Sequence, residues 1–157
     1  MGQEIERKFL VTGDAWRTDV EDVSRLQQGY LSTSAKATVR VRIYDDERAV
    51  LTLKGPAEGL VRAEFEYPIP LEDARDLMKL ATPNTVEKHR HRVPHGNHVW
   101  EVDVFDGAHQ GLILAEVEME TANDQVILPD WLGREVTEDD RYANASLSRN
   151  PGVPDER

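Results

Sequence analysis

The sequence contains no cysteine among its 157 residues. This absence excludes disulfide bonds, thiolate metal sites and cysteine nucleophiles, and it fits a reducing compartment. A metal ion bound by this chain would have to be held by oxygen atoms or by imidazole nitrogen.

Long apolar segments are also lacking. No stretch approaches the roughly 18 apolar residues that cross a membrane, and no basic segment followed by an apolar run opens the chain. We therefore expect a soluble, cytoplasmic protein that does not bind a membrane. The length suits one domain with a substantial core, which we assign to residues 1–148. We expect residues 149–157 to form a disordered tail.

Positive charge is in deficit, with 30 Asp and Glu residues against 19 Lys and Arg residues and a net charge of -11. This charge repels a phosphate backbone, so we expect no nucleic acid partner. One group of charged residues that alternate with other residue types is nearly neutral, however. Its acids are Glu4, Glu6, Glu64, Glu66, Asp103, Glu116 and Glu118, and its bases are Lys8, Arg40, Arg42, Lys54, Lys88 and Arg90. A polyanionic ligand would be repelled everywhere except at this group.

Alternation with period two dominates the chain and predicts strands. The predicted strands cover residues 3–11, 25–33, 37–44, 48–54, 60–69, 85–93, 98–105 and 112–121. Helical period marks residues 71–81, and a second helix is predicted to begin at Thr137 and to bury Tyr142, Ala143 and Leu147. The fold class is therefore mostly β (α+β). We expect a closed eight-stranded antiparallel β-barrel, which has no exposed edge, with a few helices packed outside.

The alternating charges also predict which face of each strand points inward. Arg40 and Arg42 share one face of their strand, and Glu64 and Glu66 share one face of theirs. For a single strand, a salt-bridged exterior is the commoner arrangement and remains the alternative. The repetition over most strands favours an interior position, because the apolar faces are then covered by the helices. The sequence therefore predicts a wet, charge-lined channel.

The first of these strands places Glu4 and Glu6 on one face at a spacing of about 7 Å. Two carboxylates at that distance repel by roughly 2 kcal/mol at an effective dielectric constant near 20. A cation is needed to relieve such pairs, and a divalent metal ion is the obvious candidate.

Seven motifs resemble, in their order along the chain, those of the CYTH family of triphosphate tunnel metalloenzymes, and in particular its short bacterial branch. They are Glu4-x-Glu6-x-Lys8, Arg40-x-Arg42, Lys54 in Leu53-Lys54-Gly55, Glu64-x-Glu66, Lys88-x-Arg90, Asp103 and Glu116-x-Glu118. The resemblance implies an eight-stranded antiparallel tunnel that binds a triphosphate. It further implies one or two Mg²⁺ or Mn²⁺ ions and hydrolysis of a phosphoanhydride bond.

The same resemblance implies metal ligands and catalytic residues. The implied ligands are Glu4, Glu6 and Glu118 for a first ion, with Glu64, Glu66, Asp103 and Glu116 holding a second ion or orienting water. The catalytic set would comprise Glu4, Glu6, Lys8, Lys88, Glu116 and Glu118. Metal-bound water has a lowered pKa and can attack in line, with a carboxylate as proton acceptor. Which carboxylate accepts the proton stays open.

The bases are expected to bind phosphate oxygens, the arginines by two-pronged hydrogen bonds and the lysines as point charges. The predicted substrate-binding residues are Lys8, Arg40, Arg42, Lys54, Lys88, Arg90 and Tyr30. The resemblance suggests that Lys88 and Tyr30 close or shape one end of the channel, although a packed strand aromatic explains Tyr30 equally well. His89 and His91 lie opposite Lys88 and Arg90 on their strand, so a zinc site is not expected there.

The leading hypothesis is a metal-dependent inorganic triphosphatase acting on tripolyphosphate. A thiamine triphosphatase and a class IV type adenylate cyclase are alternatives on the same fold. A module that binds polyphosphate without turnover and a structural barrel without a ligand are alternatives of other classes. The full carboxylate set argues against the module, because acids repel an anion unless a metal ion intervenes, and buried unpaired charges argue against the barrel. The oligomeric state stays open.

Overall fold

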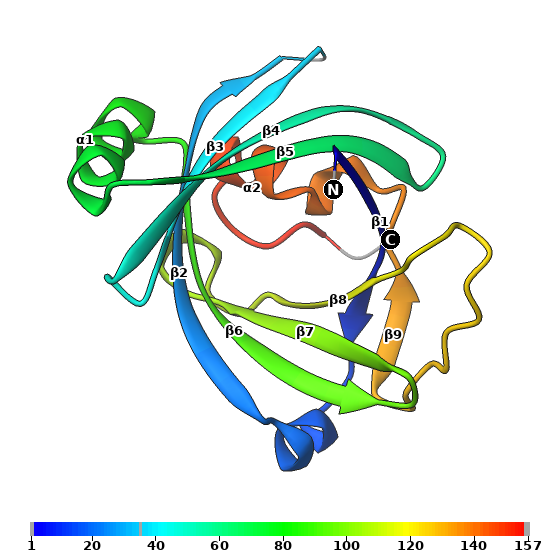
Figure 1. Ribbon diagram of the computed structural model, residues 1–157. Helices are drawn as coiled ribbons and strands as arrows, with labels where there is room; N and C mark the ends of the chain where they lie inside the picture. Colours follow the sequence, from blue (N-terminus) through cyan, green and yellow to red (C-terminus); the bar gives the residue numbers. More distant parts are fainter. Residues whose placement is uncertain (1, 35, 156–157) are drawn as a thin grey trace.

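The computed structural model describes residues 2–34 and 36–155, and its main feature is a closed antiparallel β-barrel (Figure 1). The strands are β1 (Gly2–Val11), β2 (Asp22–Thr33), β3 (Thr38–Tyr44), β4 (Arg48–Glu58), β5 (Val61–Ile69), β6 (Thr85–His95), β7 (His98–Phe105), β8 (Ile113–Glu118) and β9 (Leu132–Glu135). The first eight follow the order β5-β4-β3-β2-β6-β7-β8-β1, and the pairing of β1 with β5 closes the ring. The predicted fold class is therefore confirmed.

Helices are few and short. They are α1 (Leu71–Ala81), α2 (Asn144–Arg149) and the 3₁₀ turns η1 (Ala15–Asp19), η2 (Gly107–His109) and η3 (Asp140–Tyr142). The prediction of α1 is confirmed, and Glu72 and Asp73 in its first turn interact favourably with the helix dipole. Figure 1 shows α1 against the outer wall of the barrel, whereas α2 lies behind the opening of the ring. No helix among the described residues is long and apolar enough to cross a membrane.

The predicted helix beginning at Thr137 is wrong. The Thr137 hydroxyl accepts from Lys8 N at 3.0 Å and donates to Glu135 Oε2 at 2.6 Å, so this side chain joins two strands instead of capping a helix. The chain instead forms η3 and then α2. Tyr142 and Leu147 are buried as predicted, whereas Ala143 is half-buried.

The C-terminal part of the sheet also differs from the prediction. Residues 112–121 were expected to form one strand, but β8 ends at Glu118, and Glu120 N then donates to Asp124 Oδ2 in a turn. The four-residue β9 was not predicted, because so short a segment carries no readable alternation. It pairs with the end of β1, where Val11 lies opposite Leu132.

Apolar residues cover much of the outer wall of the barrel. One cluster comprises Phe9, Trp16, Val93, Trp100, Val102, Ala115, Val117 and Trp131, and a second, beneath α1, comprises Val41, Ile43, Ala49 and Ala74. Val102 alternates with Asp103, and Val41 alternates with Arg40 and Arg42. The apolar faces therefore lie outside and the charged faces inside, as the sequence predicts.

One end of the barrel interior is apolar, which the sequence did not indicate. A third cluster comprises Val86, Phe105, Leu112, Leu114, Val136, Tyr142 and Leu147. Val86, Phe105 and Leu114 have the same strand parity as the inward charges Lys88, Asp103 and Glu116. Since Tyr142 and Leu147 belong to η3 and α2, these two elements seal this end of the barrel. We call it the α2 end.

The segment after α2 runs back over the barrel. Gly152 N donates to Ala108 O at 2.8 Å, and the Arg149 guanidinium donates to Thr33 Oγ1 at 2.9 Å. The disorder expected for residues 149–157 stays a prediction, and residues 156–157 lie outside the described part.

Packing of α1 on β2 depends on the absence of a side chain at Gly29. A Cβ atom there would lie 2.7 Å from Ala81 Cβ and 2.8 Å from Met78 Sδ. We expect Gly29→Ala to lower the free energy of unfolding by about 1–3 kcal/mol, because overpacking forces α1 away from the sheet. Thermal unfolding should show a midpoint several degrees lower. Gly55→Ala is the control, because its Cβ would meet only Ala63 Cβ at 3.4 Å; equal midpoints for the two variants would contradict the packing argument.

Candidate active site inside the barrel

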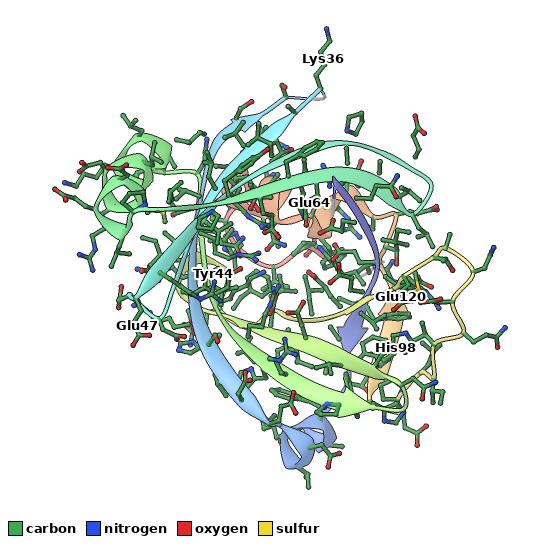
Figure 2. The ribbon with its side chains drawn as sticks, in the orientation of Figure 1. Lys36, Tyr44, Glu47, Glu64, His98 and Glu120 are labelled. Atoms are coloured by element: carbon green, nitrogen blue, oxygen red, sulfur yellow. The ribbon has the colours of Figure 1, made fainter. Side chains whose placement is uncertain are left out.

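A polar cavity of about 190 Å³ lies inside the barrel. Its walls come from β1, β3, β4, β5, β6, β7 and β8, with one residue of α2. The lining residues are Glu4, Glu6, Arg40, Arg42, Tyr44, Lys54, Glu64, Glu66, Arg90, Glu101, Glu116, Glu118 and Asn144. We call this space the main cavity. Side chains fill the interior of the ring in Figure 2, whereas Lys36 and Glu47 point away from it.

The structure brings nearly all of the predicted site residues to this interior. Ten of the thirteen residues lining the main cavity belong to the predicted set, and Lys8 and Tyr30 line an adjoining cavity. The remaining two, Lys88 and Asp103, are fully buried. Their assignment to substrate, metal or catalysis stays a prediction, because proximity alone does not test a role.

Asp103 forms the most deeply buried ion pairs of the site. Its Oδ1 lies 2.8 Å from Arg90 Nε, and its Oδ2 lies 2.7 Å from Lys88 Nζ. Burial opposes ionisation, but the adjacent Arg90 and Lys88 outweigh it and hold the pKa of Asp103 below its usual value. Both carboxylate oxygens are therefore engaged by protein cations, so Asp103 orients Lys88 and Arg90.

Lys88 has an unusual environment for an ammonium group. Burial lowers its pKa to about 7, although Asp103 acts in the opposite direction. Besides Asp103, the Lys88 ammonium donates to Asn144 Oδ1 at 3.1 Å and lies 5.2 Å from the centre of the Phe105 ring. This lysine can therefore hold or release a proton near neutral pH.

Two arginines of β3 extend side by side into the cavity. Arg42 Nε donates to Gln28 Oε1 at 2.7 Å, and an Arg42 terminal nitrogen donates to the Tyr44 hydroxyl at 3.0 Å. Arg40 donates to Thr52 Oγ1 at 3.3 Å, but its Nε is buried without a hydrogen-bond partner among the described residues. A buried donor without a partner is costly. An anionic ligand would supply the missing acceptor.

The lysines of the site hold carboxylates from different strands. Lys54 Nζ lies 2.9 Å from Glu4 Oε2 and 3.4 Å from Glu64 Oε2. Lys8 Nζ lies 3.5 Å from Glu116 Oε1. Burial raises the pKa of Glu4, with Lys54 acting against it. These contacts link carboxylates of β1, β5 and β8 to lysines of β1 and β4.

Glu6 differs from its neighbours because it forms no ion pair in the described structure. Burial raises the pKa of Glu6 to about 8, and the carboxylates of Glu116 and Glu4 add to the rise. Burial, with Glu4 and Glu101 nearby, also raises the pKa of Glu118, which lies opposite Glu6 in the pairing of β1 with β8. No described cation forms an ion pair with Glu6, and because its pKa is raised to about 8, this carboxyl group holds a proton near neutral pH.

A divalent ion fits the chemistry of this donor set, since Mg²⁺ and Mn²⁺ prefer oxygen ligands and relieve carboxylate repulsion. The described residues nevertheless contain no group of three or more acidic or histidine side chains already arranged to hold a metal. Lys54 Nζ contacts both Glu4 and Glu64, so these two carboxylates share a protein cation.

The histidines of β6 lie outside the barrel, as predicted. The His91 ring stacks edge-on against Trp16 with centroids 5.0 Å apart, and His89 Nδ1 lies 2.7 Å from Asp106. Neither residue lines the main cavity.

Sequence reasoning missed several interior residues. They are Gln28, Tyr44, Thr52, Arg62 and Asn144. A signal existed for Arg62, because it has the same parity as Glu64 and Glu66, and for Gln28, which has the same parity as Tyr30. Asn144 carried no such signal, since only the fold of the C-terminal segment brings it to Lys88.

Comparison with known proteins gives a family and several close relatives. The CYTH domain family matches residues 2–149. The chain is 41% identical over 152 residues to an inorganic triphosphatase of Acetivibrio thermocellus, with 96% of each covered. It is 40% identical over 151 residues to an inorganic triphosphatase of Nitrosomonas europaea, with 92% of this chain and 96% of that protein covered. A crystal structure of an inorganic triphosphatase superposes with a TM-score of 0.67 at 34% identity, covering 92% of this chain and 93% of that one.

The buried pairs of Asp103 predict a large effect on stability. Asp103→Asn removes the charge that compensates Lys88 and Arg90, and breaking a buried ion pair costs about 3–5 kcal/mol. We expect urea denaturation to show a loss of this size. Asp76→Asn on α1 is the control, because its pair with Lys79 is exposed and contributes little. An Asp103→Asn protein as stable as the control would show that Asp103 does not hold the interior together.

The raised pKa of Glu6 predicts a pH-dependent effect. The folded protein binds this proton more tightly than the unfolded chain does, so Glu6 lowers stability as the pH rises from about 4.5 to about 8. Glu6→Gln mimics the protonated form. With chelator present, we expect it to raise the free energy of unfolding at pH 8 by on the order of 1–2 kcal/mol, allowing for partial exposure, and to have little effect near pH 5. Glu47→Gln at the exposed β3–β4 turn is the control. A pH-independent difference would contradict the assignment.

Proposed function

The chain belongs to the CYTH domain family, and from this premise we propose that it is a divalent-metal-dependent inorganic triphosphatase. It hydrolyses a phosphoanhydride bond of tripolyphosphate inside the barrel. The observation that carries this proposal is the convergence of arginines, lysines and carboxylates on one enclosed cavity, where Arg40 Nε has no acceptor in the part of the chain that the structure describes. The names of the relatives support the substrate class.

The cationic side chains would bind the phosphate groups. Arg40 and Arg42 present guanidinium groups suited to two-pronged contacts, and Lys8 and Lys54 act as point charges. Arg90 is held by Asp103, and Lys88 lies behind it. In an enclosed site these fixed charges stabilise the negative charge that develops during phosphoryl transfer. Tyr30 shapes the adjoining cavity, where its ring is buried.

Carboxylates would hold the metal ion. We assign Glu4, Glu6 and Glu118 to a first ion, and Glu64, Glu66, Asp103 and Glu116 to a second ion or to orientation of water. Of these, Glu6 and Glu118 fit best, since neither forms an ion pair with a described residue, and Asp103 fits least, since Lys88 and Arg90 occupy it. A bound Mg²⁺ or Mn²⁺ ion supplies Lewis acidity and lowers the pKa of a coordinated water.

Proton transfer falls to groups beside the phosphates. Burial opposes ionisation of Glu116, but Lys8 and Arg90 with Lys88 outweigh it and keep the pKa of Glu116 well below the usual value. Glu116 therefore stays ionised and orients Lys8, which lies 3.5 Å away. Lys88, with its pKa near 7, can hold or release a proton at Nζ, but it is fully buried beside Asp103 and lines neither cavity, so it would act through its neighbours.

The lining of the main cavity favours an inorganic substrate over an organic one. Among its described lining residues, Tyr44 is the single aromatic side chain, and its hydroxyl is engaged by Arg42. Base or thiazole recognition generally relies on aromatic and apolar surface. Thiamine triphosphatase and adenylate cyclase activities are therefore not better supported than inorganic triphosphatase activity. A binding module without turnover is disfavoured by the uncompensated carboxylates around Glu6.

A substrate panel with chelator and metal ions tests the proposal. We expect phosphate release from tripolyphosphate to be much faster than from ATP or thiamine triphosphate, and to require Mg²⁺ or Mn²⁺. Glu4→Gln should lower kcat/KM at least about 100-fold, because it removes a metal ligand, whereas Glu47→Gln should not. Metal-free binding of tripolyphosphate should persist or tighten in Glu4→Gln. Faster turnover of an organic triphosphate would overturn the substrate assignment, and full activity of Glu4→Gln would overturn the metal assignment.

A further inference from the structure

The interior of the barrel is electrostatically polarised along its length. The main cavity is lined by seven acids and four bases. A smaller cavity of about 80 Å³ adjoins it at the α2 end, bounded there by residues 143–145. The charged side chains of this smaller cavity are Glu6, Lys8, Arg40, Lys54 and Arg62. Four cationic side chains and one acidic side chain therefore line this smaller cavity, which we call the basic cavity. No motif of the sequence assigns it a separate function.

Arg62 is the cation of this basic cavity that no motif of the sequence includes. It lies on β5 with the same parity as Glu64 and Glu66, and it is directly opposite Glu4 in the pairing of β1 with β5. Its Nε donates to Gly55 O at 2.7 Å, which fixes the base of the guanidinium group on its own hairpin. The residue is half-buried, and it lines the basic cavity.

The positive charge of Arg62 is not neutralised within the described structure. Lys54 pairs with Glu4 and Glu64, whereas Arg62 forms no ion pair with any described residue. It also borders a second small cavity, whose other charged lining residues are Glu4, Glu6, Lys8, Asp139 and Asp140. Asp139 is held by Arg141 at 2.8 Å, and none of these carboxylates forms an ion pair with Arg62. Within the described residues, the terminal N–H groups of Arg62 therefore have no acceptor.

We propose that Arg62 binds the phosphate group at the α2 end of the bound tripolyphosphate, an inference that rests on the proposed function. A terminal phosphate has three non-bridging oxygens and matches the paired donors of a guanidinium group. The α2 end is sealed by η3 and α2, so the terminal phosphate is the part of the chain that can occupy it. The acid-rich main cavity receives the remainder of the substrate with its metal ion.

This placement separates substrate binding from bond cleavage. Arg62 lies on the basic side, away from Glu118 and Glu116, which do not line its cavity. Its contact with a terminal phosphate is present in the ground state and in the transition state alike, so its loss should raise KM more than it lowers kcat. Arg62 is thus a substrate-binding residue that determines affinity for the phosphate chain.

The test compares Arg62→Ala, Arg62→Gln and Arg62→Lys with the wild type. For tripolyphosphate hydrolysis we expect Arg62→Ala and Arg62→Gln to raise KM about tenfold with kcat within about threefold, and Arg62→Lys to recover part of the loss. Titration calorimetry with tripolyphosphate and chelator should show a matching loss of affinity. Arg75→Ala is the control, because it removes the same charge from the exposed face of α1.

The outcomes separate this inference from the proposed function. Wild-type protein that does not hydrolyse tripolyphosphate overturns the proposed function, whatever the variants do. Active wild type together with unchanged KM and binding affinity in Arg62→Gln overturns the inference alone and leaves Arg62 as a hairpin contact to Gly55. A fall in kcat at constant KM also overturns it. Arg62→Gln keeps a hydrogen-bond donor on the hairpin, so it provides the test if Arg62→Ala fails to fold.

Discussion

The Asp103 carboxylate, held between Lys88 and Arg90, is the interaction on which the interior of this barrel depends. All three groups point inward from β6 and β7, and Asp103 and Lys88 are completely shielded from solvent. Isolated charges in such a place would be too costly to bury, whereas a compensated set with good geometry is tolerated. These ion pairs hold the side chains of Arg90 and Lys88 in place, next to the apolar cluster that closes the α2 end.

The other charged groups of the interior have fewer ion-pair partners than Asp103 has. We relate this difference to the binding of a ligand. Among the described residues, Arg40 Nε has no acceptor and the Glu6 carboxyl group has no ion-pair partner. An apolar or fully paired core would be more stable than this arrangement. Sites that bind charged ligands commonly retain such strain, because the ligand supplies the missing partners. A phosphate chain and a divalent ion together would supply both kinds of partner here.

The apolar clusters explain how the barrel accommodates a wet interior. Trp16, Trp100 and Trp131 pack on its outer wall, and α1 covers another part of that wall. Stability therefore comes from the outside of the barrel and from one sealed end, instead of from a central core. Because apolar packing lies elsewhere, the interior positions of the barrel can be occupied by charged residues.

The sequence by itself determined eight of the nine strands, the inward parity of their charges and most of the residues lining the cavity, because a period of two is a local property of each strand. A local pattern contains no information on which strands are neighbours. Strand pairing therefore decided that Asp103 is engaged by Lys88 and Arg90, and that Glu6 lies opposite Glu118. The helix expected at Thr137 does not form, because the Thr137 hydroxyl accepts a hydrogen bond from the backbone N–H of Lys8, which is distant in sequence. Asn144 reaches Lys88 only because α2 folds back across the barrel end, a long-range placement set by apolar burial of Tyr142 and Leu147.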